Sequence, residues 1–156
     1  MVARRIVVRR DDLAGQASRD LIELHLRGMH EHSPPEAIFA LDLNGLQRPD
    51  VEVWSALVDD RVAGIGALRK LSPERGEIKS MRTHPDFVRQ GIADAILARI
   101  IERANALGIR MLSLETGSGP GFDAATRFYR ARGFVEGEAF GDYVSSDFNR
   151  FFHRAL

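Results

Sequence analysis

Residues 93–107 carry the most informative pattern in this chain, an apolar periodicity in steps of three and four residues. The apolar positions are Ala93, Ile96, Leu97, Ile100, Ile101, Ala104 and Leu107. This spacing predicts an amphipathic helix, and Gly108 is placed to end it in a left-handed conformation. An amphipathic helix must bury its apolar face against another element, so the rest of the chain has to supply an apolar surface.

Apolar and β-branched runs elsewhere predict the strands of that surface, at 3–9, 51–58, 62–68, 77–83 and 111–114. The Asp59-Asp60 pair predicts a tight antiparallel hairpin between the second and third runs. Further helices are expected from Ser18 towards Pro34, over 36–44, and around Phe128 up to Gly133, with one or two strands after 134. No repeat or linker divides the chain, so the sequence predicts a single α/β domain over residues 1–156.

Composition excludes several classes of partner and site. The 22 Lys and Arg residues match 22 Asp and Glu residues, so there is no net field to attract nucleic acid or an anionic membrane. The absence of cysteine excludes a disulfide scaffold, a thiolate metal site and a cysteine nucleophile. No apolar run approaches the length of about 18 residues that suggests a transmembrane helix. We therefore expect a cytoplasmic protein with neither nucleic-acid nor membrane partners.

The turn before the amphipathic helix combines the features of an anion site. A helix start presents unpaired backbone N–H groups and the positive end of the helix dipole. Gly91 and Ala93 would let a phosphate approach the backbone, and Arg89 adds a charged donor. The segment lacks the Gly-Lys-Ser/Thr of a Walker loop and the third glycine of a dinucleotide fingerprint. Taken alone, Gly91 can equally be read as a flexible joint before a helix.

Three segments that follow the hairpin form a more specific pattern together. They are 77–85 (Glu-Ile-Lys-Ser-Met-Arg-Thr-His-Pro), 89–93 (Arg-Gln-Gly-Ile-Ala) and 125–134 (Ala-Thr-Arg-Phe-Tyr-Arg-Ala-Arg-Gly-Phe). In this order and spacing they resemble the GCN5-related N-acetyltransferases (GNAT), which transfer acetyl from acetyl-CoA to amines. The resemblance implies a mixed, mostly antiparallel central sheet flanked by helices, with a splayed strand pair that holds the cofactor.

The resemblance also implies where the cofactor binds. Met81 and Thr83 would contact the pantetheine arm, and the pyrophosphate would bind the backbone amides of Arg89, Gln90, Gly91, Ile92, Ala93 and Asp94. The chain departs from the family pattern at two positions. Val88 stands where the family usually has Arg or Gln, and Phe122 stands where the later helix usually opens with Asn.

Acetyl transfer to an amine needs an acid for the departing thiolate, donors to the developing oxyanion and a path for the amine proton. The resemblance places Tyr129 near the thioester sulfur, where it would act as the acid. Without the resemblance, Tyr129 can be read instead as an aromatic residue of the core. The N–H of Met81 is a reasonable oxyanion donor. Glu115 is the first candidate base and Glu77 the second, because each lies near the end of a strand beside the cleft. A water relay could replace either carboxylate.

The histidines at 25, 30 and 32 lack the spacing of a helical metal motif and any thiolate partner, so we predict no metal. His30 and His32 are instead candidate substrate contacts, as are Asp142 and Tyr143 near the carboxyl end; solvated loop residues are the alternative in each case.

The sequence thus predicts an acetyl-CoA-dependent N-acetyltransferase that transfers acetyl directly to a small-molecule amine. A homodimer built through the carboxyl-terminal strands is a further expectation. Three alternatives remain open: a non-catalytic acyl-CoA sensor, a protein N-acetyltransferase, and a nucleotide-binding or adaptor domain that uses the Gly91 turn.

Overall fold

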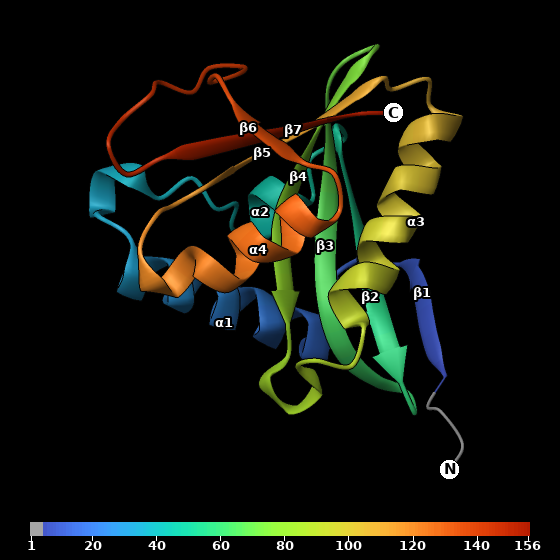
Figure 1. Ribbon diagram of the computed structural model, residues 1–156. Helices are drawn as coiled ribbons and strands as arrows, with labels where there is room; N and C mark the ends of the chain where they lie inside the picture. The colour runs from blue at the N-terminus through green and yellow to red at the C-terminus, as the bar shows by residue number, and fades with distance from the viewer. Residues whose placement is uncertain (1–4) are drawn as a thin grey trace.

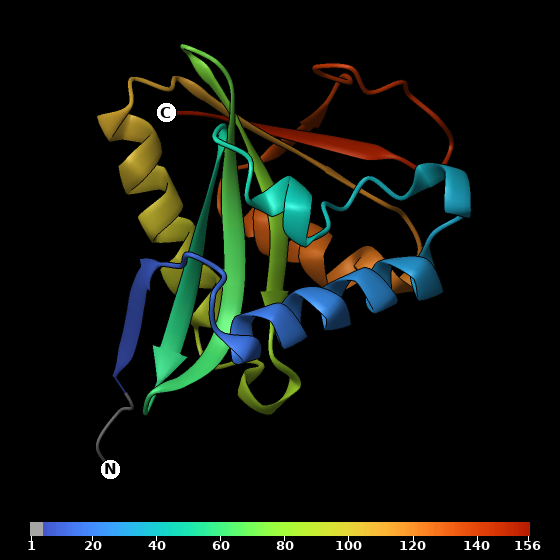
Figure 2. The ribbon, with the colours of Figure 1, turned by 180° about the vertical axis from the view of Figure 1, so that it is seen from behind.

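The computed structural model describes residues 5–156 and contains a seven-stranded sheet with helices on both faces (Figures 1 and 2). The strands are β1 (Ile6–Arg10), β2 (Val51–Val58), β3 (Arg61–Ser72), β4 (Arg75–Thr83), β5 (Met111–Thr116), β6 (Val135–Gly137) and β7 (Arg150–Ala155). Their order in the sheet is β1-β2-β3-β4-β5-β7-β6. Every neighbouring pair is antiparallel except β4 and β5, which are parallel. This confirms the expected mixed, mostly antiparallel sheet.

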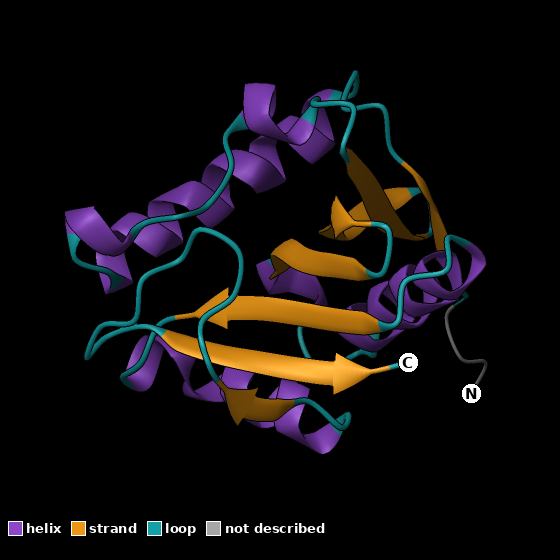
Figure 3. Cartoon of the chain, turned by 90° about the horizontal axis from the view of Figure 1, so that it is seen from above, coloured by secondary structure: helices purple, strands orange, loops and turns teal. Residues whose placement is uncertain are grey.

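Four α-helices and three short 3-10 turns connect these strands within the described residues. The helices are α1 (Gln16–His32), α2 (Leu43–Leu46), α3 (Ile92–Ala106) and α4 (Asp123–Ala131). The turns are η1 (Pro35–Ala37), η2 (Pro85–Phe87) and η3 (Pro120–Phe122). Seen from above, the helices lie on both sides of the strands (Figure 3).

The hairpin and the long helix form where the sequence predicts them. Asp59 and Asp60 have φ values of 50° and 64° between β2 and β3. Two left-handed residues in a row match the right-handed twist of a two-residue hairpin, and aspartate tolerates this conformation. Gly108, with a φ of 79°, follows α3 as expected.

The expected helix over 36–44 is wrong, because this segment holds only η1 and the start of the one-turn helix α2. The Asp42 side chain accepts a hydrogen bond from the Gly45 N–H at 2.8 Å, so Asp42 starts a helical turn where Asn44-Gly45 was expected to end one. Leu41 and Leu43 pack against the core instead of continuing an outer helical face. At the amino end, positions 3 and 4 of the expected strand lie outside the described residues, and β1 runs from Ile6 to Arg10.

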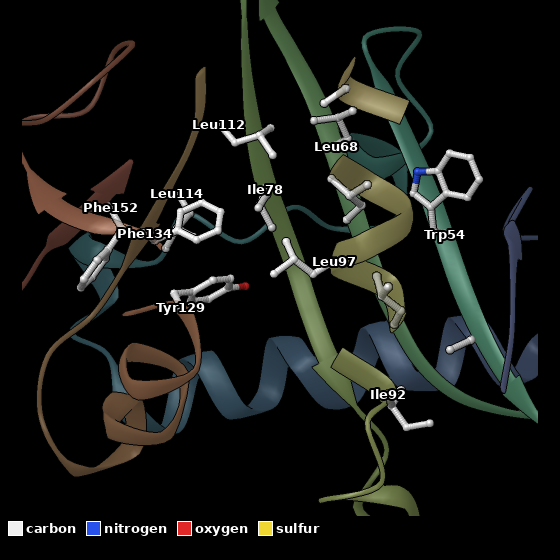
Figure 4. Packing of buried hydrophobic residues seen from close by; sticks show 14 of the residues in the cluster. Trp54, Leu68, Ile78, Ile92, Leu97, Leu112, Leu114, Tyr129, Phe134 and Phe152 are labelled. Atoms are coloured by element: carbon white, nitrogen blue, oxygen red, sulfur yellow. The ribbon is translucent and has the colours of Figure 1, made fainter. Parts of the chain in front are cut away.

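The helices cover the sheet with two separate apolar clusters. On one face, α3 buries Ile92, Ile96 and Ile100 against β2, β3 and β4. Figure 4 shows residues of this cluster along α3 and the strands, with Ile92 at one end and Leu68 towards the other. On the other face, α1 buries Leu21 and Ile22 against β2 and β3. Gly66 on β3 allows the close approach of α3, since a Cβ there would lie 2.6 Å from Ile96 Cγ2.

The parallel strands β4 and β5 part soon after they meet. Their paired residues are Arg75 with Met111, Gly76 with Leu112 and Glu77 with Ser113, and no pairing follows towards the carboxyl ends. Figure 1 shows the two strands diverging beyond this point. The backbone edge of β4 that faces β5 is therefore free of strand pairing from Ile78 to Thr83, which is the splay that the sequence resemblance implied.

Candidate active site

A cleft of about 410 Å³ opens where β4 and β5 part. It is lined from both faces of the sheet, by His25 and Met29 of α1 on one side and by Ala93 and Ile96 of α3 on the other. Helix α4 adds Tyr129. A cleft that reaches both faces can admit two reactants from opposite sides and bring them together between the strands.

The turn after β4 exposes the start of α3. Gly91 is the residue before the helix, has a φ of 82° and provides no side-chain cap for the first N–H groups. Arg89 has a φ of 61°, a left-handed conformation that is uncommon for a residue with a side chain. Free N–H groups at a helix start, together with the helix dipole, are complementary to an anion, and Ala93 lines the cleft beside them.

Two polar side chains of this turn already form hydrogen bonds within the protein. Both carboxylate oxygens of Asp94 accept hydrogen bonds from Arg132, one of them from Nη2 at 2.6 Å. This pairing holds the pKa of Asp94 below its usual range. The Gln90 amide donates to the carbonyl of Asp86 at 3.4 Å. Asp94 thus offers an anion its backbone N–H, while its carboxylate is neutralised by Arg132.

A bulge in β4 lies directly beside the cleft. Lys79 pairs with Ala67 and Arg82 pairs with Ile65, so Ser80 and Met81 together face Gly66 alone. Ser80 has a φ of 57°, as the extra residue of a bulge often does. Met81 and Thr83 both line the cleft. The bulge therefore lies in the stretch of β4 that no longer pairs with β5.

Tyr129 lies between the two strands with its ring almost fully buried, at 6% exposure. Its ring contacts Phe128 and Phe134 edge to face, and Figure 4 shows its hydroxyl directed towards β4. Burial raises the pKa of this phenol, so the hydroxyl keeps its proton throughout the neutral range. The group can therefore donate a proton or a hydrogen bond inside the cleft.

Glu115, near the end of β5, is the carboxylate best poised to accept a proton. Burial raises its pKa from 4.5 to about 7, with nearby Lys79 opposing the shift and Glu77 adding to it. A group with this pKa is divided between its acid and base forms at neutral pH, which suits a general base.

Glu77 belongs to a buried polar cluster on the α1 face of β4. Its carboxylate accepts hydrogen bonds from Lys79 Nζ at 3.2 Å and from Tyr143 Oη at 2.5 Å, and Lys79 also donates to Tyr143 Oη at 2.9 Å. Glu77 is only 1% exposed. An ion pair with a shared phenol satisfies both charges, so Glu77 is held in place and is a less available base than Glu115.

Arg82 and His25 form a second polar pair on the same face. Arg82 Nε donates to His25 Nδ1 at 3.0 Å. Burial, and then the charges of Arg82 and Lys79, lower the pKa of His25 to about 3. His25 is therefore a neutral acceptor, and both residues line the cleft.

Comparison with known proteins matches residues 18–134 to the family model described as Acetyltransferase (GNAT) family. The chain belongs to the GNAT acetyltransferase family. The chain is 41% identical over 149 residues to the uncharacterized N-acetyltransferase YedL of Escherichia coli (strain K12), which covers 96% of this chain and 94% of that protein. It is 46% identical over 133 residues to the uncharacterized N-acetyltransferase YsnE of Bacillus subtilis (strain 168), covering 85% and 88% of the two chains.

Solved structures show the same fold. One from Klebsiella pneumoniae subsp. pneumoniae superposes with a TM-score of 0.78 at 20% identity and covers 97% of both chains. A GNAT family acetyltransferase from Elizabethkingia anophelis, solved with acetyl-CoA bound, has a TM-score of 0.72 at 17% identity and covers 97% of this chain and 98% of that one. The family match and the two curated relatives, rather than these structures, make this protein a GNAT-type acetyltransferase.

The cleft is lined by six of the fifteen residues that the sequence singles out, Ala93 at the start of α3 among them. The others are Tyr129, Glu115, Glu77, Met81 and Thr83. Arg89, Gln90, Gly91, Ile92 and Asp94 are not among its lining residues. Tyr143 is not among them either, but it contacts Glu77 and Lys79, which are. His30 and Asp142 are exposed and are not among the residues that line it. His32 packs against Gly121 beside a neighbouring hollow between α1 and η3.

The reason lies in α1, which is helical as far as His32, so the helical phase decides which of its side chains face the cleft. His25 and Met29 are four residues apart and share the face that lines the cleft. His30 points well away from that face, and His32 lies two turns beyond His25. Phe39, from the segment after η1, lines the cleft in their place and contacts the ring of Tyr143 edge to face.

Sequence reasoning missed His25, Lys79, Arg82 and Phe39 as cleft residues. A signal for two of them exists in the sequence, because Lys79 and Arg82 are cations inside a strand that the pattern predicts to be buried. Val88 and Phe122, the two departures from the family pattern, also line the cleft. Among residues 5–156 no group of three or more His, Asp or Glu side chains is arranged to hold a metal ion, and no helix there is long and apolar enough to cross a bilayer.

Proposed function

We propose that this enzyme transfers the acetyl group of acetyl-CoA directly to the primary amine of a small molecule. The observation that carries the proposal is the cleft between β4 and β5, which places a protonated tyrosine and a carboxylate of near-neutral pKa around one space. The uncapped start of α3 and the unpaired edge of β4 fit the pyrophosphate and the amide-rich arm of CoA.

In this proposal each residue has one task. The bound cosubstrate supplies an acetyl thioester. Glu115 accepts the proton that the amine loses as its nitrogen bonds to the acetyl carbon, and the N–H of Met81 donates to the acetyl oxygen. Tyr129 gives its proton to the sulfur as the carbon–sulfur bond breaks. The burial that raises the pKa of Tyr129 keeps its hydroxyl protonated, so a proton is available for the departing thiolate.

The cofactor assignment is tested by thermal unfolding with acetyl-CoA, CoA, ATP or NAD at equal excess. At about 100 times its Kd a ligand stabilises a protein by roughly 2.7 kcal/mol, which should raise Tm by about 5 to 10 °C for a chain of this size. We expect this shift with both CoA compounds and none with ATP or NAD. A larger shift with ATP, or none with CoA, would overturn the assignment. Thiol release measured with a panel of amines then tests the transfer reaction.

The role of Glu115 predicts the pH profile. As a base of pKa about 7, it is protonated and inactive in acid and ionised above that value. When kcat/KM is calculated on the concentration of neutral amine, it should therefore rise with pH through about 7 and then level off. In Glu115→Gln the rise near pH 7 should disappear. The fall in kcat/KM at pH 8 should be limited to roughly tenfold, because water can accept the proton in place of the carboxylate.

The matched control is Glu102→Gln, since Glu102 is a carboxylate on α3 with a side chain 73% exposed. It should keep the wild-type profile. An unchanged inflection in Glu115→Gln would assign the titration to another group and remove Glu115 as the base.

A further inference from the structure

We propose that Arg82 binds a carboxylate of the acceptor, so that the amine acetylated here belongs to an α-amino acid with an apolar side chain. This inference rests on the proposed function and names the substrate class for the same cleft.

Arg82 is a cation without a counter-ion. Its Nε donates to His25, and among residues 5–156 no carboxylate forms an ion pair with its guanidinium group or acts on its pKa. Burial lowers its pKa, and no acidic residue counteracts that effect. An unpaired charge that is partly removed from water is unfavourable, so a guanidinium that lines a cleft in this state is complementary to an anion.

The surroundings of Arg82 fix its orientation. His25 stays neutral and accepts from Nε, which leaves the two terminal nitrogens without a hydrogen-bond partner in the described part of the chain. Gly28 allows α1 to pass close to the group, since a Cβ there would lie 2.9 Å from Nη2. A guanidinium held through Nε presents its terminal nitrogens as a pair, which matches the two oxygens of a carboxylate.

The position of Arg82 places it on the acceptor side. The side chain contacts His25 of α1, whereas the turn that suits a pyrophosphate precedes α3 on the opposite face. Met81, the residue before it, lies against Gly66 and α3. Arg82 also follows Ser80 of the bulge by two residues, which is about 7 Å along a strand. A carboxylate at Arg82 therefore lies a short molecule's length from the backbone at the bulge.

The charges of the cleft match a zwitterion. Glu77 and Lys79 neutralise each other in their ion pair. Glu115 and Arg82 remain, one able to carry a negative charge and the other positive. An amino acid carries both an ammonium group and a carboxylate, whose charges are complementary to those of these two side chains. A lysine side chain in a protein has no carboxylate beside its amine and would leave Arg82 unpaired.

The remaining wall on this side is apolar. Met29 lies one helical turn after His25, and Phe39 contacts the ring of Tyr143 edge to face. Met29 and Phe39 both line the cleft. They can cover the side chain of an amino acid whose carboxylate is at Arg82. This favours leucine, methionine or phenylalanine over amino acids with charged side chains.

The experiment compares three acceptors that share one side chain and differ in whether a carboxylate, an amide or a hydrogen stands beside the amine. Thiol release from acetyl-CoA is measured with L-phenylalanine, L-phenylalanine amide and 2-phenylethylamine, and with leucine and methionine as further acids. We expect kcat/KM for L-phenylalanine to exceed that for 2-phenylethylamine by at least tenfold. In Arg82→Gln this ratio should fall by about 10- to 100-fold through a higher KM for the acid, since hydrogen bonds to a charged group are lost. Arg82→Lys keeps the charge but lacks the paired N–H donors of a guanidinium group. Its ratio should therefore lie between those of the wild type and Arg82→Gln.

Each result decides the proposal. No turnover of any of the three amino acids, or an unchanged ratio in Arg82→Gln, would overturn it. So would a tenfold loss of CoA affinity in Arg82→Gln, because Arg82 would then belong to the cofactor site. The proposed function is tested separately by the CoA-induced thermal shift and by turnover of 2-phenylethylamine, which can succeed while the amino acids fail. Thermal unfolding of each variant without ligand shows whether it folds.

Discussion

Gly91→Glu should abolish CoA binding while leaving the protein folded. The substitution places a carboxylate at the uncapped start of α3, where the pyrophosphate is expected, so like charges meet at a site built for one anion. A Cβ at Gly91 would meet only Ile6 Cδ1, at 3.9 Å, so the side chain has room. We expect the CoA-induced rise in Tm to vanish, which corresponds to a loss of affinity of at least about 100-fold.

Two control variants separate charge from backbone strain. Gly91→Gln introduces the same bulk at a φ of 82° without the charge and should bind CoA more tightly than Gly91→Glu does. Gly108→Glu introduces the same charge at a similar φ of 79°, at the other end of the same helix, and should keep the full CoA shift. Each substitution forces a side chain into the left-handed region at a cost of about 1 to 2 kcal/mol. Survival of the CoA shift in Gly91→Glu would show that the phosphate site lies elsewhere.

The elements that the sequence predicts well are those with local causes. Helix α3 follows from its apolar spacing and the β2–β3 hairpin from two strands joined by Asp59-Asp60. The prediction for segment 36–44 is wrong because its leucines pack, partly buried, against the core of β2 and β3, a contact that no local periodicity encodes. The splay of β4 from β5 is likewise a property of the sheet, and only the resemblance to a family anticipated it.

The candidate site is harder to predict because its contacts join distant parts of the chain. Tyr143 bonds to Glu77 across 66 residues, and Arg82 bonds to His25 across 57. A strand pattern shows that residues 77–83 are buried but not which helix covers them. His25 and His30 look equivalent in the sequence, and only the helical phase of α1 turns His25 into the cleft and His30 to solvent.

Tyr129→Phe should lower kcat by about 100- to 1,000-fold with little change in CoA affinity. The variant removes only the hydroxyl that would protonate the departing sulfur, and general acids contribute acceleration of this order. The ring keeps its contacts with Phe128 and Phe134, so packing is preserved. The hydroxyl has no hydrogen-bond partner among residues 5–156, and its loss leaves no buried group unpaired. Steady-state assays of thiol release give kcat. The rise in Tm on adding CoA is the control that cofactor binding is unchanged.

Tyr143→Phe is the informative comparison, because Tyr143 is the only other tyrosine in the chain. Its hydroxyl donates to Glu77 on the acceptor side; burial, and then the charge of Glu77, raise its pKa. Loss of this hydroxyl removes one partner from the Glu77–Lys79 pair and should act mainly on the KM of the amine. A general acid must instead lower kcat and kcat/KM together, because its interaction forms only as the bond to sulfur breaks. A Tyr129→Phe enzyme with kcat within threefold of the wild type would remove Tyr129 as the acid and leave the thiolate to depart without a protein donor.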